Sequence, residues 1–356
     1  MKRILFYIDS MQIGGANRVI ANLVEYFFKL GKEVILVNDI KLENNILEYE
    51  IPKKVIRKYL DDKLRGRLKK NILRIIRLRR IIKEEKPDVV LSFMGPPNER
   101  MILATLGLPI RKIVSVRNDP YREYGSGIKK IITNFLFRFV DGCVFQTEEA
   151  REYFKKTIQK KSTIIFNPVN KKFYNQELLQ EKKYILMVGR LQSQKNPHLL
   201  LEAFLEIEDK YRDFKLIFCG EGELKESLNK KIVEKDLQER VIFCGQVKNV
   251  EKYLAEASVY VLSSDYEGMP NALMEAMAVG VPIIATDCPC GGPRTLIENE
   301  KQGILINCRD KESLQENLQK LLDDKDLRER MRSESRKRAE IFCSDKIFKQ
   351  WEEFLN

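Results

Sequence analysis

Short apolar runs alternate with longer amphipathic segments along this whole chain, and this rhythm leaves few folds open. In the first half, runs of strand length fall at 4–8, 33–38, 88–93, 112–116, 142–146 and 163–167. The second half repeats them at 184–189, 215–220, 240–245, 259–264, 282–287 and 303–307. Strands that alternate with helices are typical of parallel sheets built from βα units. The pattern predicts an α/β protein with two doubly wound domains in tandem.

The join between the two halves is marked by composition. Residues 168–183 are polar and have neither a helical nor a strand period, so we expect the domain linker there. We predict an N-terminal domain over 1–175, a C-terminal domain over 182–340 and a terminal helix over 341–356. Because ligands of such sheets bind at the carboxyl ends of the strands, the cleft between the domains is the expected site.

The terminal helix is amphipathic, with Phe348, Trp351 and Phe354 on one side. This apolar side indicates that the helix packs against a core. Two placements stay open, because the helix could return to the N-terminal domain or cap the C-terminal domain that precedes it.

Cysteine and histidine usage narrows the chemistry. The seven cysteines are scattered, and the nearest two, Cys288 and Cys290, lack the spacing of a zinc site. Their odd number, and a first segment that is more strand-like than signal-like, favour a cytoplasmic protein. His198 is the one histidine, so a mechanism built on Ser–His or His–metal groups would depend on it. No apolar run approaches the ~20 residues that span a bilayer.

Positive charge is concentrated in the first half. Residues 1–180 carry 36 Lys and Arg against 20 Asp and Glu, a net charge of +16, whereas the remainder carries −4. Segment 53–86 alone carries +11. Its apolar residues recur at steps of three and four, as on one face of a helix: Leu64, Leu68, Ile72, Ile75, Leu78 and Ile82.

Two compatible interpretations of this basic segment stay open. The helix could pack its apolar face on the core and expose a basic surface, and that surface could dock on an anionic membrane. No zinc-finger or RNA-binding signature accompanies the charge, so nucleic acid is not an expected partner.

Two loops between strand and helix carry groups that suit an anion. Gly14 and Gly15 follow the first apolar run, where glycine lets backbone N–H groups approach an anion at a helix start. A plain turn is the alternative. Arg190 and Lys195 follow the run at 184–189 and suit a diphosphate, although such loop cations are often only solvated.

The block SSDYEGMPNALMEAMAVGVPIIATD at 263–287 carries the strongest signal. Glu267 lies in a loop after a strand, and Glu275 lies eight positions on, in a helix that begins near Pro270. Both carboxylates could accept hydrogen bonds from sugar hydroxyls, and N–H groups at the helix start could meet phosphate or sugar oxygens. Two surface glutamates beside a helix start are the alternative.

This block resembles the E-x7-E donor-site motif of the retaining glycosyltransferases of family 4, which have the two-domain GT-B fold. Further motifs follow in the family's order: GGA at 14–16, NPV at 167–169, VGRL and KNP within 188–197, GEG at 220–222 and GQV at 245–247. The stretch 287–305 resembles bacterial members that build surface polysaccharides. The resemblance covers nearly the whole chain and implies two Rossmann-like domains that face a central cleft.

The resemblance implies a role for each matching residue. Arg190 and Lys195 would bind the donor diphosphate, Glu275 the ribose hydroxyls, and Glu267 the transferred sugar. Glu267, Arg190 and Lys195 are therefore the expected catalytic residues, with the two cations in place of a metal. The other expected donor contacts are Gly14, Gly15, Gln246, Val247, Gly268, Met269, Asn271 and Ala272.

The sequence departs from the family at one position. Many members carry a histidine after the strand that corresponds to 112–116, and this chain has Arg117 and Asn118 there. We expect Arg117, Asn118 or Asp119 to line the acceptor side instead. Retention by front-face attack needs no enzyme nucleophile, so the missing histidine need not abolish activity.

The resemblance implies a retaining enzyme that moves a hexose or N-acetylhexosamine from a nucleotide sugar, expected to be UDP-linked, to a lipid-linked saccharide in polysaccharide biosynthesis. We expect no metal or cofactor, and a cytoplasmic protein held at the inner face of the membrane by segment 53–86. Two alternatives remain: a GT-B epimerase acting on UDP-N-acetylhexosamine, and a non-catalytic nucleotide-sugar-binding protein. A dinucleotide oxidoreductase is disfavoured because G-x-G-x-x-G is missing.

Overall fold

In the computed structural model the chain forms two compact units. Unit 1 comprises Met1–Asn167 and Asp345–Asn356, and unit 2 comprises Pro168–Ser344. Unit 1 thus ends before the expected boundary at 175, because Val169 pairs with Cys343 and Phe173 is buried within unit 2. The structure describes residues 1–43, 46–60, 66–176 and 181–356.

Unit 1 is built on a seven-stranded parallel sheet of order β3-β2-β1-β4-β5-β6-β7. The strands are β1 (Arg3–Ile8), β2 (Glu33–Asn38), β3 (Ile56–Tyr59), β4 (Val89–Phe93), β5 (Arg111–Ser115), β6 (Gly142–Phe145) and β7 (Ser162–Ile164). The helices are α1 (Gly15–Lys29), α2 (Arg67–Glu85), α3 (Gly95–Thr105), α4 (Pro120–Glu123), α5 (Ile128–Leu136), α6 (Glu148–Glu152), α7 (Lys156–Gln159) and α15 (Ser344–Leu355), with a short 3-10 turn, η1 (Phe137–Phe139).

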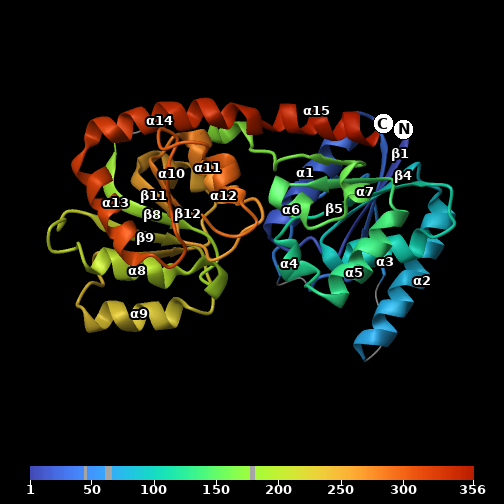
Figure 1. Ribbon diagram of the computed structural model, residues 1–356, viewed down its shortest axis with the longest axis horizontal. Helices are drawn as coiled ribbons and strands as arrows, with labels where there is room; N and C mark the ends of the chain where they lie inside the picture. The colour runs from blue at the N-terminus through green and yellow to red at the C-terminus, as the bar shows by residue number, and fades with distance from the viewer. Residues whose placement is uncertain (44–45, 61–65, 177–180) are drawn as a thin grey trace. The chain divides into compact units, whose positions relative to one another are not determined.

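Both faces of this sheet are covered, which is why its central strands are apolar throughout. Alternate residues of β1 face opposite sides: Ile4 and Phe6 pack with α1 and α15, whereas Leu5 and Tyr7 pack toward α2 and α3. Figure 1 shows these two helix layers on either side of the strands of unit 1.

The terminal helix α15 packs into the core of unit 1. Trp351 is fully buried, and its ring stacks on Phe93 of β4 with 5.7 Å between ring centroids. Phe348 stacks on Tyr26 of α1 at 4.8 Å. Ile347, Trp351 and Leu355, one helical turn apart, form the buried stripe of this helix.

Unit 2 has a six-stranded parallel sheet of order β10-β9-β8-β11-β12-β13. Its strands are β8 (Lys182–Val188), β9 (Lys215–Cys219), β10 (Val241–Gly245), β11 (Ala257–Leu262), β12 (Ile283–Thr286) and β13 (Ile304–Ile306). Its α-helices are α8 (Pro197–Leu205), α9 (Lys225–Glu234), α10 (Val250–Glu256), α11 (Asn271–Val279), α12 (Gly292–Leu296), α13 (Lys311–Asp323) and α14 (Lys325–Ala339). Its 3-10 turns are η2 (Lys171–Phe173), η3 (Ser193–Lys195) and η4 (Glu340–Phe342). Helices α8, α9 and α13 share one core with the sheet, while α10, α11 and α14 cover its other face (Figure 1).

Two features of segment 53–86 differ from the sequence prediction. Residues 56–59 form the edge strand β3, which was not predicted because the run IRKY contains two charged residues. The helix begins at Arg67, and only its second half is buried, because Leu78 and Ile82 face the core whereas Leu68 and Ile72 are exposed. Leu64 of the predicted face lies outside the described residues.

In each sheet, successive strands are first added toward one edge and then toward the other. This switch point lies between β1 and β4 in unit 1 and between β8 and β11 in unit 2. The crevice outside the carboxyl ends of such a strand pair is where open α/β sheets bind their ligands. A ligand site is therefore expected in the loops after these four strands.

Candidate active site

The loop after β8 depends on glycine for its path. A Cβ at Gly220 would collide with the carbonyl oxygen of Gly189, and one at Gly222 would collide with that of Leu191. The backbone N–H of Leu191 donates to the carbonyl oxygen of Glu221 at 3.0 Å. This close approach holds the start of the loop that carries Arg190 and Lys195 against the end of β9.

Hydrogen bonds join this loop to the one after β11. The N–H of Asp265 donates to the carbonyl oxygen of Gln194 at 2.9 Å, and the Gln194 side chain donates to the carbonyl oxygen of Tyr266 at 3.0 Å. Asn196 Nδ2 donates to Asp265 Oδ1 at 3.1 Å. The two loops of the switch point therefore form one connected structure, in which each positions the other.

Lys195 and Glu267 meet at the centre of these loops. The ammonium group of Lys195 donates to Glu267 Oε1, and the Ser264 hydroxyl donates to the same oxygen at 2.7 Å. Glu267 is only 6% exposed, and these two donors satisfy its Oε1. The methylene groups of Lys195 run beside Gly189, where a Cβ would lie 3.5 Å from Lys195 Cε. The two residues that the sequence placed 72 positions apart thus form one charged pair.

The backbone after Glu267 is packed tightly. A Cβ at Gly292, the first residue of α12, would collide with the carbonyl oxygen of Gly268 and lie 3.0 Å from Pro270 Cδ. The helix α11 begins directly afterwards, with Pro270 as its N-cap. That helix start therefore presents the partial positive charge that attracts phosphate oxygens.

Glu275 lies in the second turn of α11, as predicted, and is 5% exposed. Burial raises the pKa of the Tyr260 phenol well above its ordinary value, and the nearby carboxylates of Glu267 and Glu275 raise it further. Both glutamates therefore lie close enough to Tyr260 of β11 to act on it electrostatically. Neither is the solvated surface residue of the alternative interpretation.

The remaining donor-site candidates differ in exposure. Arg190 and Gln246 are exposed, Val247 is half-buried, and the latter two follow β10, two strands away from β8. Met269 is buried, whereas Asn271 and Ala272 are half-buried at the start of α11. The structure thus brings together Lys195, Glu267, Gly268 and the start of α11. Gln246 and Val247 lie at the same carboxyl end of the sheet, after its edge strand β10.

In unit 1, Gly14 and Gly15 follow β1 at the switch point. Gly14 is the extended N-cap of α1, without a side-chain cap, and Gly15 is exposed. A Cβ at Gly14 would meet its nearest atom, Asn17 Oδ1, at 3.6 Å, an ordinary contact. The protein's own packing does not require glycine at position 14.

Arg117 lies where the family histidine would fall, and it is buried. Its guanidinium donates to Asn167 Oδ1 and, at 3.3 Å, to Ser115 Oγ, and it lies 4.8 Å from the ring centre of Phe93. Burial lowers the pKa of Arg117 to about 9. Asp119 is also buried, and it caps α4 by accepting from the N–H of Tyr121 at 2.9 Å, while Asn118 is half-buried.

Glu123, which the sequence interpretation missed, lies beside Arg117. Its Oε1 accepts the N–H of Gly95 at 2.6 Å, at the start of α3, and its buried Oε2 has no hydrogen-bond partner among the described residues. Burial raises the pKa of this carboxyl to about 7. Gly95 follows β4, the second strand of the switch point. A glycine at that place in the sequence was the one signal that another residue, here Glu123, packs closely against it.

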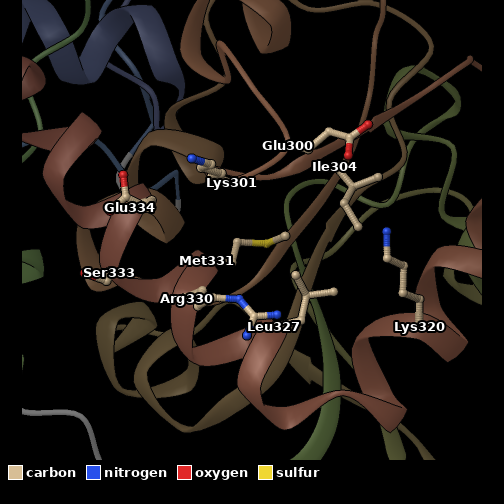
Figure 2. Close-up of a pocket in the computed structure, with 9 residues that line it drawn as sticks. All are labelled: Glu300, Lys301, Ile304, Lys320, Leu327, Arg330, Met331, Ser333 and Glu334. Carbon is tan, nitrogen blue, oxygen red and sulfur yellow. The ribbon is translucent and has the colours of Figure 1, made fainter.

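A separate hollow in unit 2 is not the candidate site. This cavity of about 540 Å³ lies beside α13 and α14, and Figure 2 shows the side chains that line it. Glu300 and Lys301 of its lining precede β13, so the hollow lies at the amino end of that strand, away from the switch-point loops. Its lining carries charged side chains of both signs, among them the exposed Glu300 and Arg330.

Two further findings concern metals and membranes. Within the described residues, no group of three or more His, Cys, Asp or Glu side chains could hold a metal ion. None of the helices in that part of the chain combines the length and the apolar character needed to cross a bilayer.

Two doubly wound parallel domains, with connected charged loops at the switch point of the second, define a protein of the GT-B class. A family model described as "Glycosyltransferase Family 4" matches residues 13–173, and one described as "Glycosyl transferases group 1" matches residues 169–338. The chain belongs to this family of glycosyltransferases, which are enzymes.

Individual relatives agree with this membership. The chain is 30% identical to an uncharacterised glycosyltransferase of Methanocaldococcus jannaschii, over 79% of this chain and 82% of the relative. It is 26% identical to a Campylobacter jejuni α-1,4-N-acetyl-D-galactosaminyltransferase named for a diphospho-undecaprenol-linked saccharide, over 99% of this chain and 97% of the relative. Among solved structures, an Anabaena protein, HepE, in complex with UDP and glucose matches with a TM-score of 0.83 at 15% identity, over 100% of this chain and 99% of that chain.

Proposed function

We propose that this glycosyltransferase transfers a hexose or N-acetylhexosamine, with retention of configuration, from a UDP-sugar to a lipid-linked saccharide during assembly of a surface polysaccharide such as a capsule. The observation that carries the proposal is the pair of Lys195 with buried Glu267, which joins the switch-point loops ahead of the start of α11. The Campylobacter relative is named for a lipid-linked acceptor and the Anabaena structure holds UDP, which supports the classes of acceptor and donor.

The donor would be bound by charge and by backbone groups. Arg190 and Lys195 would hold the diphosphate, with N–H groups of Gly268, Met269, Asn271 and Ala272 on phosphate and sugar oxygens. Glu275 would accept the ribose hydroxyls, and the turn at Gln246–Val247 would lie against the base. Gly14 and Gly15 would approach the phosphates or the acceptor.

The catalytic task in this proposal is to stabilise charge on the departing diphosphate. Lys195 and Arg190 carry positive charge at a site that the surrounding loops hold in place, so little reorganisation is needed when the bond breaks. Glu267 would orient the hydroxyls of the transferred sugar, and no side chain acts as a nucleophile. We propose that the two cations make a metal ion unnecessary.

The acceptor side would be formed by Arg117, Asn118 and Asp119, which follow β5. Arg117 is held by Asn167 and Ser115, so it would act from a fixed position rather than as a mobile side chain. Asp119 keeps the following helix in place by capping it. These contacts support a structured acceptor edge without the family histidine.

We also propose that the enzyme is cytoplasmic and binds the inner face of the membrane through segment 53–86. Part of this charge serves the fold, because Arg74 pairs with Asp39 at 3.2 Å and Arg79 donates to the carbonyl oxygen of Ala104 at 2.9 Å. Arg77 donates to the carbonyl oxygen of Leu60 and Arg80 pairs with Glu84, so the exposed cations of α2 that remain for anionic lipid include Lys69 and Lys83.

Product analysis tests the proposal. Purified enzyme with a UDP-sugar panel and a lipid-linked disaccharide should release UDP and extend the acceptor, and Lys195→Ala and Glu275→Ala should lose both products. An epimerase would instead yield a new UDP-sugar without free UDP, and a binding protein would bind without turnover. Neither alternative is favoured, since the named relatives are transferases. Failure of the wild type to bind any nucleotide sugar would refute the proposal.

A further inference from the structure

Helix α5 of unit 1 has its amphipathic pattern turned outward. Ile128, Ile131, Ile132 and Phe135 are 76%, 64%, 54% and 55% exposed. On its inner side, Thr133 and Asn134 are each only 2% exposed. A helix on a water-facing surface normally has the opposite arrangement, so the outer face of α5 is not explained by contact with water.

Polar contacts, together with packing of Leu136 on the core, hold the inner side. Asn134 Oδ1 accepts the N–H of Lys155 at 2.7 Å, and Lys130 lies over the ring of Tyr153 at 4.6 Å. These contacts give the helix a defined orientation, in which its isoleucines face outward. The outward face is therefore a fixed feature of the fold.

The apolar face extends beyond the helix. Phe139 of η1 is 44% exposed, and its ring contacts that of Phe135 edge-on, with 5.5 Å between ring centroids. We define the α5 face as Ile128, Ile131, Ile132, Phe135 and Phe139. Five large apolar side chains gathered on one surface mark an interaction site rather than scattered surface hydrophobics.

Charge identifies the occupant. No Asp or Glu occurs between Glu123 and Asp141, whereas Lys129 and Arg138 flank the α5 face and are exposed. Lysine is depleted in protein–protein interfaces, but cations beside large apolar side chains are typical of helices that lie in the headgroup region of anionic membranes.

A second helix on the same side of unit 1 repeats this composition. Leu68, Ile72 and Ile76 of α2 are exposed and alternate with lysines and arginines. Helix α3 packs against both α2 and α5, and in Figure 1 all three lie on one side of the sheet of unit 1. Two helices that combine exposed apolar side chains with cations therefore lie on one side of this sheet.

We propose that the α5 face inserts into the acyl-chain boundary of an anionic membrane while Lys129 and Arg138 contact its headgroups. This deepens the membrane association proposed above, because it adds burial of apolar surface to attraction by segment 53–86. The two contributions separate physically, since salt screens the charges but not the apolar contact.

The direct test is binding to vesicles of phosphatidylglycerol and phosphatidylcholine, measured by co-sedimentation. The triple variant Ile128→Ser, Ile131→Ser, Phe135→Ser should bind about a hundredfold more weakly. Removing charge with Lys129→Gln and Arg138→Gln should cost about fivefold per cation at low salt and much less at high salt. The matched control Leu30→Ser, Val233→Ser removes exposed apolar side chains elsewhere and should bind as the wild type does.

A second measurement does not depend on folding of the triple variant. The single change Phe135→Trp should give fluorescence that lipids brominated on the acyl chains quench, while buried Trp351 provides a constant background in the wild type. Unquenched emission from the introduced tryptophan on bound vesicles, or wild-type binding by the folded triple variant, would overturn the inference. So would a dimer in vesicle-free buffer that the triple variant alone dissociates while vesicle binding persists.

Failure of this inference is distinguishable from failure of the proposed function. Vesicle binding needs neither donor nor acceptor, and turnover of a water-soluble acceptor analogue should be unchanged in the triple variant. Loss of vesicle binding in the triple variant, without any transferase activity in the wild type, would support the α5 face and refute the transfer reaction.

Discussion

The segment after β5 in unit 1 and the loop after β11 in unit 2 hold buried charge in opposite ways. In unit 2, buried Glu267 receives the ammonium group of Lys195 and the hydroxyl of Ser264. In unit 1, buried Arg117 is met by a neutral amide and a hydroxyl, and Glu123 by a single backbone N–H. A direct ion pair stabilises the charges in unit 2, whereas in unit 1 the effect of burial outweighs the attraction between Arg117 and Glu123.

This difference indicates different work at the two edges. The loops of unit 2 hold their ionised groups in place before a ligand arrives, as a site for a fixed diphosphate requires. The edge of unit 1 contains a carboxyl whose pKa is raised to about 7, so its charge changes near neutral pH. Donor binding should therefore depend on specific pairs, and the edge of unit 1 should respond to pH.

The largest effect is expected when the unit 2 pair is broken. In Lys195→Ala, Glu267 would remain buried without its cation, and one charge on the donor diphosphate would lose its partner. We expect kcat/KM to fall about a thousandfold or more. The matched control is Arg309→Ala. It removes an exposed arginine that pairs with Asp265, a residue of the same loop as Glu267, and should change kcat/KM less than about threefold. Equal losses in both variants would contradict the assignment.

Gly292→Ala tests whether tight packing keeps the unit 2 loops in place. Its Cβ would collide with the carbonyl oxygen of Gly268, a backbone atom that cannot rotate away. We expect a loss of about 2–4 kcal/mol in unfolding free energy, measured with denaturant, and weaker donor binding. A variant as stable as the wild type would show that these loops are adaptable, and would remove the contrast with unit 1.

Glu123→Gln tests the titratable edge of unit 1, where Glu99, Arg117 and Asp119 are the nearby charged groups. A carboxyl whose pKa rises on folding favours the folded state in its protonated form. That contribution is present below pH 4.5 and is lost as the pH rises through about 7. The variant should therefore gain stability relative to the wild type over this window, by about 1.4 kcal/mol per pH unit at most.

Thermal unfolding between about pH 5 and 8 measures this difference for Glu123→Gln. The control is Glu148→Gln, which alters an exposed glutamate of unit 1 and should leave the pH dependence unchanged. A pH-independent difference between Glu123→Gln and the wild type would mean that Glu123 is ionised throughout.

The smallest effect on stability is expected for Gly14→Ala. The added Cβ has room, and the backbone there is extended, so unfolding free energy should change by about 0.5 kcal/mol or less. Any rise in KM for donor or acceptor would then report a ligand that approaches this backbone. An unchanged KM would remove position 14 from the proposed site.

Most of the fold could be predicted from the sequence, because buried parallel strands are continuous apolar runs. All twelve predicted runs correspond to strands, and the missed strand, β3, lies at a sheet edge where IRKY need not be apolar. Periodicity could not tell which side of a helix is buried. Helices α5 and α15 have the same amphipathic pattern, yet α15 buries its apolar side and α5 exposes it.

The candidate site was predictable where charged residues follow strands. Lys195 and Glu267 were placed in loops after β8 and β11, and these loops meet. The backbone bonds that join the loops, such as the one from Asp265 to Gln194, leave no mark in side-chain patterns. Glu123 was missed because its special character comes from burial against Gly95, a neighbour 28 positions away.

The place of α15 has a consequence for how the chain acquires its structure. Trp351 fills the core between α1 and the sheet of unit 1, yet it is separated from the rest of that unit by all of unit 2. During synthesis the continuous unit 2 can complete its contacts first. Until α15 has been made, the apolar residues of unit 1 that it covers, such as Phe93 of β4, stay exposed. Newly made chains should therefore depend on chaperones for the first unit, and Trp351 fluorescence should report the final step of folding.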